Sequence, residues 1–127
     1  MIYLDANVII RLIEGQPAVK NPIETRLLLE SALITSQLSR IECRCMPLRM
    51  ANQPQLDLYD VFFSSAGLIL VDIDSRVINR ATEIRATTKF KTPDAIHLAS
   101  AIVSGATAFL TGDEQLAQFQ GITVEII

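Results

Sequence analysis

Residues 92–101 read Thr-Pro-Asp-Ala-Ile-His-Leu-Ala-Ser-Ala, and residues 108–113 read Ala-Phe-Leu-Thr-Gly-Asp. The first stretch predicts a helix, because Thr92 is a good N-cap and proline is favoured at the first helical position. The second stretch predicts a buried strand that ends at a polar turn. Asp94 and Asp113 therefore lie where a helix begins and where a strand ends.

The remainder of the chain alternates in the same way. Short apolar runs predict the strands Ile2–Asp5, Ala32–Thr35, Leu68–Asp72, Ala108–Thr111 and Ile122–Ile127. Periodic segments predict the helices Ala6–Glu14, Pro22–Ser31, Ser36 or Ser39 to Met50, Gln55–Ser65, Arg76–Thr87, Pro93–Val103 and Glu114–Phe119. Strands separated by helices form parallel sheets with right-handed crossovers, so we expect a three-layer α/β/α sandwich over a single domain, residues 1–127.

Composition limits the partners of the chain. Of its 127 residues, 50% are hydrophobic, and the formal net charge is -3. An acidic chain is not a general nucleic-acid binder, although a bound metal and local basic residues leave RNA possible. The high apolar content predicts a surface covered by a partner, drawn from two helical stripes. These stripes are Val8/Ile9/Leu12/Ile13 and Leu56/Tyr59/Phe62/Phe63.

The two cysteines, Cys43 and Cys45, would point to different faces of one helix. We therefore expect no disulfide and no zinc site, which is typical of cytoplasmic proteins. Asp5 interrupts the apolar start, so no signal peptide is expected, and no apolar run is long enough to span a membrane.

Four acidic residues follow the predicted strands or open the helices after them: Asp5, Glu42, Asp94 and Asp113. Three have an alternative structural explanation. Asp94 complements a helix dipole, Asp113 is a possible N-cap, and Glu42 could complete a capping box with Ser39. Asp5 has no such explanation, because aspartate is a poor residue in a core strand.

Taken together, the four acids favour a metal site. The carboxyl ends of parallel strands share one edge of the sheet, and ligands bind there. Carboxylates gathered without a basic partner repel one another unless a hard cation binds them. Asn7 adds a polar group at the same edge.

The chain resembles the PIN-domain ribonucleases, and among them the VapC-type toxins of bacterial toxin–antitoxin pairs. The similarity lies in Tyr3-Leu4-Asp5-Ala6-Asn7, Ser39-Arg40-Ile41-Glu42, Pro93 to Ala101 and Leu110-Thr111-Gly112-Asp113. It implies a five-stranded parallel sheet in the order 3-2-1-4-5. It also implies a Mg²⁺- or Mn²⁺-dependent endoribonuclease, a homodimer, and an antitoxin that occupies the cleft. Many relatives carry Ser or Thr where this chain has Asn7.

On this hypothesis, Asp5, Asp94 and Asp113 bind the metal, and Glu42 binds a second ion or orients the attacking water. Asn7 and Thr111 would support the acids, and Arg40, Arg44 and Lys91 would hold the RNA backbone, although these cations could equally form a solvated helix face. His97 is the only histidine, which excludes a metal-free mechanism with two histidines. We expect a structural hydrogen bond from it near the site.

Three alternatives remain open. A receiver-like signalling module would need a lysine after the last strand, and residues 122–127 contain none. A haloacid-dehalogenase-like phosphotransferase would need Asp-x-Asp, but residues 5–7 read Asp-Ala-Asn. A catalytically silent PIN fold that only binds a partner is compatible with the sequence.

Overall fold

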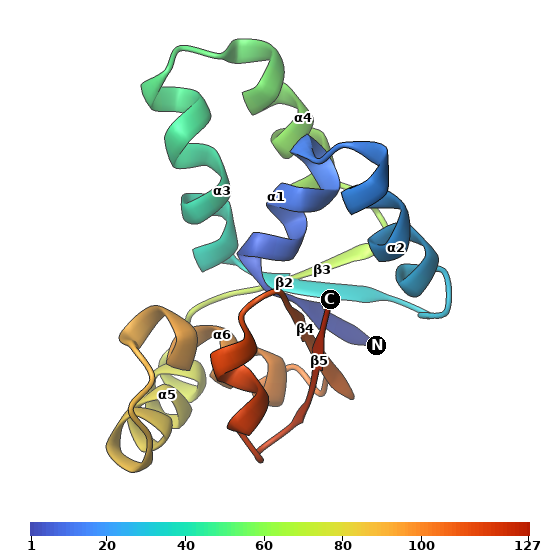
Figure 1. The fold of residues 1–127 in the computed structure, drawn as a ribbon. Coiled ribbons are helices and arrows are strands. Elements are labelled where there is room, and N and C mark those ends of the chain that lie inside the picture. Colours follow the sequence, from blue (N-terminus) through green and yellow to red (C-terminus); the bar gives the residue numbers. More distant parts are fainter.

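The computed structural model describes residues 1–127, and its five strands form one parallel sheet in the order β3-β2-β1-β4-β5 (Figure 1). The strands are β1 (Ile2–Leu4), β2 (Leu33–Ser36), β3 (Leu68–Val71), β4 (Ala108–Thr111) and β5 (Thr123–Ile126). Central strand β1 places Tyr3 opposite Ile34 of β2 and Phe109 of β4. The predicted parallel sheet and its order are confirmed. The receiver-like alternative is wrong, because those sheets have the order 2-1-3-4-5.

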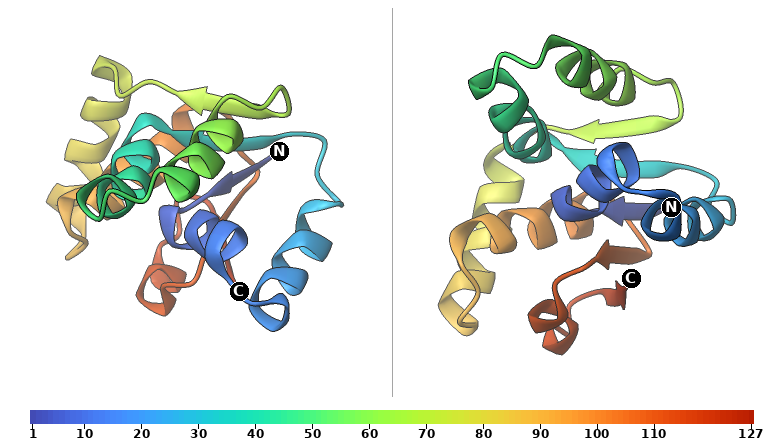
Figure 2. Two further views of the ribbon diagram at one scale, coloured as in Figure 1. Left: turned by 90° about the horizontal axis from the view of Figure 1, so that it is seen from above. Right: turned by 45° about the horizontal axis from the view of Figure 1, so that its top comes forward.

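Helices cover both faces of this sheet, as Figures 1 and 2 show. One face carries α1 (Ala6–Glu14), α2 (Pro17–Leu27), α3 (Gln37–Arg49) and α4 (Gln53–Phe63). The other carries α5 (Ser75–Thr87), α6 (Thr92–Val103) and the 3₁₀ helix η1 (Glu114–Gln118). The expected three-layer sandwich is therefore present. None of these helices has the length and apolarity needed to cross a bilayer.

Strand β1 contributes side chains to both apolar clusters of the core. Ile2 and Leu4 belong to the apolar cluster beneath α1–α4, whereas Tyr3 belongs to the cluster beneath α5 and α6. All three side chains are fully buried. A parallel strand covered on both faces needs apolar residues at successive positions, which explains why Ile-Tyr-Leu forms this strand. The Tyr3 ring stacks on Phe109 with centroids 5.2 Å apart.

The second apolar stripe does not form a free surface, which corrects one expectation. Tyr59 and Phe63 of α4 are buried in the core cluster with β1, Leu56 is buried too, and so are Val8 and Ile9 of α1. The apolar side chains that α3 and α4 leave exposed are different ones. They are Ile41, Met46, Leu48, Leu58 and Val61.

Several helix ends differ from the prediction. Helix α2 begins at Pro17 instead of Pro22 and ends at Leu27, because Pro17 already offers a favourable first-turn proline. Helix α6 has Lys91 as its N-cap, so the assignment of Thr92 is wrong. The N-cap of α3 is Ser36, which leaves Ser39 inside the helix. The capping box between Ser39 and Glu42 therefore does not form.

Candidate active site

Asp5 is a buried carboxylate at the carboxyl end of the central strand. It caps α1 by accepting a hydrogen bond at Oδ1 from the Ala6 amide over 2.8 Å, so Asp5 also has a structural role, which corrects the expectation that it has none. Its Oδ2 accepts from the Thr111 hydroxyl at 2.8 Å and from the Asn7 amide at 3.1 Å. Only 5% of the residue is exposed, and the nearest ring nitrogen is Nε2 of His97, 3.6 Å from Oδ1. Neutral donors thus hold the carboxylate in a fixed orientation.

Thr111 and Asn7 tie the end of β4 to the start of α1. The Thr111 hydroxyl accepts from the Asp113 amide at 3.0 Å and from the Asn7 side chain at 3.2 Å. The Asn7 carbonyl accepts from the Gly112 amide at 2.8 Å. A Cβ on Gly112 would lie only 3.3 Å from that carbonyl oxygen and 2.9 Å from Arg11 Nη1, so a glycine permits this close approach. The four-residue motif Leu-Thr-Gly-Asp therefore builds one wall of the site.

Asp94 and Asp113 reach the same region from two other elements. Asp94 lies in the first turn of α6, and Asp113 caps η1 by accepting from the Gln115 amide at 3.0 Å. Burial, together with the nearby carboxylates of Asp5 and Asp113, raises the pKa of Asp94 above its usual value. The structure therefore brings these three acids into one electrostatic neighbourhood.

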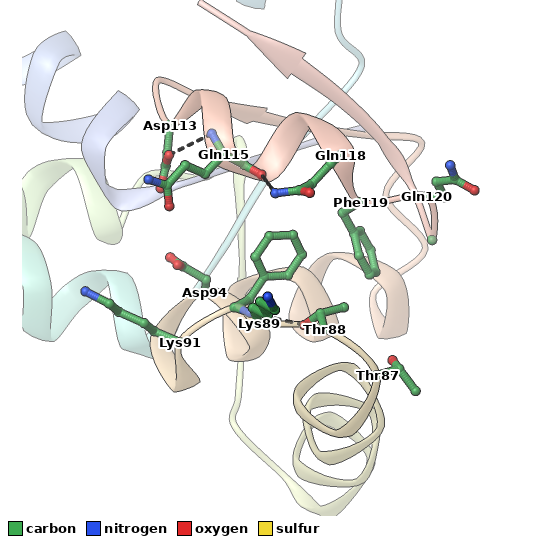
Figure 3. A pocket seen from close by; sticks show the side chains of 12 residues that line it. Thr87, Thr88, Lys89, Lys91, Asp94, Asp113, Gln115, Gln118, Phe119 and Gln120 are labelled. Carbon is green, nitrogen blue, oxygen red and sulfur yellow. Dashed lines mark hydrogen bonds between the residues drawn. The ribbon is translucent and has the colours of Figure 1, made fainter.

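A cavity of about 700 Å³ opens beside two of the acids. Figure 3 shows Asp94 and Asp113 on its wall. Lys89 and Lys91 lie on the loop between α5 and α6 that forms another side. Amide side chains and aromatic rings complete the lining, namely Gln115, Gln118, Gln120, Phe90 and Phe119. The cavity therefore combines carboxylates, cations and ring faces, a mixture suited to a nucleotide.

Glu42 approaches from α3, and its partner is the only histidine. The Glu42 Oε1 atom lies 2.5 Å from His97 Nε2, and His97 Nδ1 lies 2.8 Å from the Tyr3 hydroxyl. His97 is 2% exposed. The predicted structural hydrogen bond of His97 near the site is present, but Tyr3 as its second partner was not foreseen. A tyrosine hydroxyl buried in a core needs a partner, and this requirement could have indicated it.

The predicted RNA-contacting cations differ in their surroundings. Arg44 forms an ion pair with Asp60 of α4 at 2.8 Å, and Arg40 donates to the Gln37 side chain at 2.9 Å. Lys91 is exposed, lines the cavity and forms no ion pair. Of these three side chains, Lys91 is therefore the one placed beside the acids.

The donor chemistry of the site suits a hard divalent cation, because all four acids offer carboxylate oxygens. However, no three His, Cys, Asp or Glu side chains are close enough together to bind one ion directly. Asp5, Asp113 and Glu42 contribute to the raised pKa of Asp94, but the four acids do not share a single coordination sphere. This arrangement is compatible with Mg²⁺, which usually takes one or two carboxylates and keeps several waters.

The model of one protein family, described as the PIN domain, matches residues 2–122. Three solved structures have similar folds. One is a chain of VapBC2 from Rickettsia felis bound to promoter DNA, which is 18% identical, with a TM-score of 0.80; the alignment covers 99% of this chain and 98% of that one. Another is a chain of DNA-bound VapBC from Salmonella typhimurium, which is 21% identical, with a TM-score of 0.83; the alignment covers 98% of this chain and 96% of that one. The third is Mycobacterium tuberculosis VapC20, described as a sarcin-ricin loop cleaving toxin. It is 16% identical, with a TM-score of 0.73, and the alignment covers 97% of this chain and 99% of that one. No curated protein matches the sequence significantly.

Proposed function

The chain belongs to the PIN-domain family, and from this premise we propose that it is a divalent-metal-dependent endoribonuclease that acts as the toxin of a toxin–antitoxin pair. One observation carries the proposal: the carboxylates of Asp5, Asp113 and Glu42 all lie close enough to Asp94 to raise its pKa. The VapBC and VapC20 structures, which have the same fold, support the toxin role.

In this proposal Asp5, Asp94 and Asp113 hold Mg²⁺ or Mn²⁺ partly through coordinated waters, because no three acids are close enough to bind one ion directly, and Glu42 adds a fourth carboxylate from α3. A bound divalent cation would supply charge neutralisation at the scissile phosphate and lower the pKa of a coordinated water. The protein contributes the geometry. Asn7 and Thr111 hold Asp5 in place, and the Gln115 amide holds Asp113.

The cavity next to Asp94 and Asp113 is the proposed place for RNA. Lys89 and Lys91 would neutralise backbone phosphates at its rim, since phosphate contacts position a nucleic acid without reading its sequence. Phe119 offers a partly buried ring against which a base could stack. The net charge of -3 means that these local cations must overcome an acidic background.

We further propose a homodimer that binds a cognate antitoxin. The exposed apolar residues of α3 and α4, such as Met46, Leu58 and Val61, support a partner on that side of the molecule. Light scattering on the isolated chain tests the dimer. A particle of 14.0 kDa at micromolar concentration would contradict it. Expression together with the neighbouring gene product, followed by co-purification, tests the antitoxin.

The nuclease proposal is tested with labelled RNA, with Mg²⁺ or Mn²⁺ and then with EDTA. We expect cleavage that EDTA abolishes. Asp94→Asn should reduce the rate by more than about 100-fold, which exceeds the usual effect of residues that only orient a ligand. Asp57→Asn is the matched control, because Asp57 is an exposed aspartate on α4 that bonds only to Gln53.

Cleavage by folded Asp94→Asn at the parent rate would overturn the assignment. A parent protein that binds its partner but never cleaves RNA would favour a silent PIN fold.

A further inference from the structure

A continuous row of hydrogen-bonding groups leads from the sheet core to Glu42. The Ser36 hydroxyl at the end of β2 lies 2.9 Å from the Tyr3 hydroxyl. Tyr3 lies 2.8 Å from Nδ1 of His97, and Nε2 of His97 lies 2.5 Å from Glu42 Oε1. The row joins three separate parts of the chain: β1, the junction of β2 with α3, and α6. It ends on the one acid of the site that is carried by α3.

The hydrogen bond with Glu42 determines which ring nitrogen of His97 carries a hydrogen. An ionised carboxylate only accepts hydrogen bonds, so Nε2 of His97 must carry the hydrogen that points to Glu42. In a neutral ring Nδ1 then accepts, and the donor is the Tyr3 hydroxyl, whose single hydrogen has both Ser36 Oγ and His97 Nδ1 within reach. The contacts with Glu42 and Tyr3 thereby favour the same tautomer of His97, with the hydrogen on Nε2.

Burial makes the row rigid at its inner end and leaves it open at its outer end. Ser36 and Tyr3 are fully buried, and His97 is 2% exposed, whereas 38% of the Glu42 side chain is exposed. The Tyr3 ring is held by its stack on Phe109. A glutamate on a helix surface would otherwise sample several rotamers. The contact with His97 fixes one oxygen of Glu42 and leaves Oε2 free for another ligand.

His97 also sets where Glu42 lies relative to the other acids. Its Nε2 is 3.6 Å from Asp5 Oδ1, so the ring stands between the carboxylates of β1 and α3. It shares a helix face with Asp94, three residues earlier on α6. One buried ring thus contacts or adjoins three of the four acids.

We propose that Tyr3 and His97 are positioning residues, which hold the Glu42 carboxylate in the orientation that the divalent cation and the RNA require. This inference rests on the proposed function for its consequence, but its geometry can be tested without any activity. Tyr3 acts through His97, and His97 acts through its hydrogen bond with Glu42.

The first test is nitrogen NMR of the metal-free protein. His97 is the only histidine, so its two ring nitrogens can be observed without assignment. We expect a protonated Nε2 with a slowly exchanging, downfield-shifted hydrogen. Glu42→Ala should move that hydrogen upfield, and Tyr3→Phe, which removes one of the two contacts that favour this tautomer, should lower its population. An Nε2 without a hydrogen, or signals unchanged in both variants, would overturn the proposal.

The second test measures Mn²⁺ affinity by water-proton relaxation, beside cleavage kinetics. Tyr3→Phe keeps the ring and its stack but lacks the hydroxyl, and we expect it to weaken Mn²⁺ binding by about 10–100-fold, as is typical for residues that orient a metal ligand. The rate constant kcat should fall, and the KM for RNA should stay the same. His97→Gln, whose amide can still donate to Glu42, should retain more activity than His97→Phe.

Tyr59→Phe is the matched control, because Tyr59 is also fully buried and donates its hydroxyl to a glutamate, Glu14, on the far side of the sheet from Tyr3. It should bind Mn²⁺ and cleave like the parent. Equal effects of the two tyrosine variants would reduce Tyr3 to a purely structural role and overturn the proposal. If the parent itself neither bound Mn²⁺ nor cleaved RNA, the proposed function would fail, whereas the NMR result alone would still decide whether Tyr3 and His97 hold Glu42.

Discussion

The hydroxyl of Thr111 donates a hydrogen bond to Oδ2 of Asp5 over 2.8 Å, and so joins the ends of strands β4 and β1 within the site. The same oxygen of Thr111 accepts from the Asp113 amide and the Asn7 side chain. One fully buried hydroxyl therefore serves three polar groups, and two of them belong to acids proposed to bind metal. Thr111, the last residue of β4, therefore links Asp5, Asn7 and Asp113 within the site.

Thr111→Val should destabilise the protein by about 1–3 kcal/mol, because it keeps the shape but leaves buried polar groups without a partner. Thr111→Ser retains the hydroxyl and should lose much less. Urea denaturation, read as the free energy of unfolding, compares the two. Equal free energies for Val and Ser would show that the hydroxyl is not needed.

Asp94→Asn should raise the melting temperature of the metal-free protein at neutral pH. Burial and the carboxylates of Asp5 and Asp113 raise the pKa of Asp94, so folding favours its uncharged form. Its contribution to stability is fully present below the ordinary value of 3.8 and is lost as the pH rises through the raised value. Thermal melts from acid to neutral pH should show this loss in the parent and less of it in Asp94→Asn. The Asp57→Asn control should follow the parent curve.

Mn²⁺ should raise the melting temperature of the parent more than that of Asp94→Asn. An ion that binds only the folded state raises the melting temperature, by an amount that grows with the ratio of its concentration to Kd. At millimolar Mn²⁺ we expect a clear rise for the parent and a smaller one for Asp94→Asn. The measurement is the same melt with and without metal. No rise for the folded parent would count against a cation at these carboxylates.

The architecture was predictable because the hydrophobic pattern and the family similarity indicate the same fold. Apolar runs of strand length alternate with helical stripes, and the similarity to PIN domains supplied the strand order, which periodicity alone does not contain. Local choices were less predictable. Pro17 and Pro22 can both open a helix, and packing of Ile23 under the sheet accompanies the earlier start at Pro17. Sequence spacing does not include that packing.

The site was predictable where its residues sit at strand ends, as with Asp5 and Asp113. It was less predictable where partners are distant in sequence. Glu42 and His97 are 55 positions apart, and no local pattern connects them. The capping box predicted for Glu42 failed because Ser39 instead bonds to Thr35 at 2.7 Å. Tertiary contacts therefore determine the partners of Ser39 and Glu42, which local sequence does not indicate.

Arg26→Gln should remove a link between α2 and β5. Arg26 donates to both oxygens of Glu125, at 2.7 and 2.8 Å, and these hydrogen bonds lower the pKa of Glu125. The corresponding stability is present above the ordinary pKa of 4.5 and is lost as the pH falls through the lowered value. We expect a loss of about 1 kcal/mol at neutral pH, the upper range for partly exposed pairs. Arg76→Gln, which breaks the exposed pair with Asp74, should cost less in the same denaturation measurement.

Lys91→Gln should weaken RNA binding without altering the fold. Lys91 is exposed at the cavity beside Asp94 and Asp113, and it has no carboxylate partner to give up. If it contacts one phosphate of a single strand, its loss should reduce the slope of log K against log salt by about 0.7. Fluorescence anisotropy with labelled RNA in Ca²⁺, across a salt series, measures both the affinity and the slope. Lys20→Gln is the matched control, because Lys20 lies on α2 and pairs with Glu24. Equal changes in the two variants would indicate a general charge effect and would remove Lys91 from the proposed RNA site.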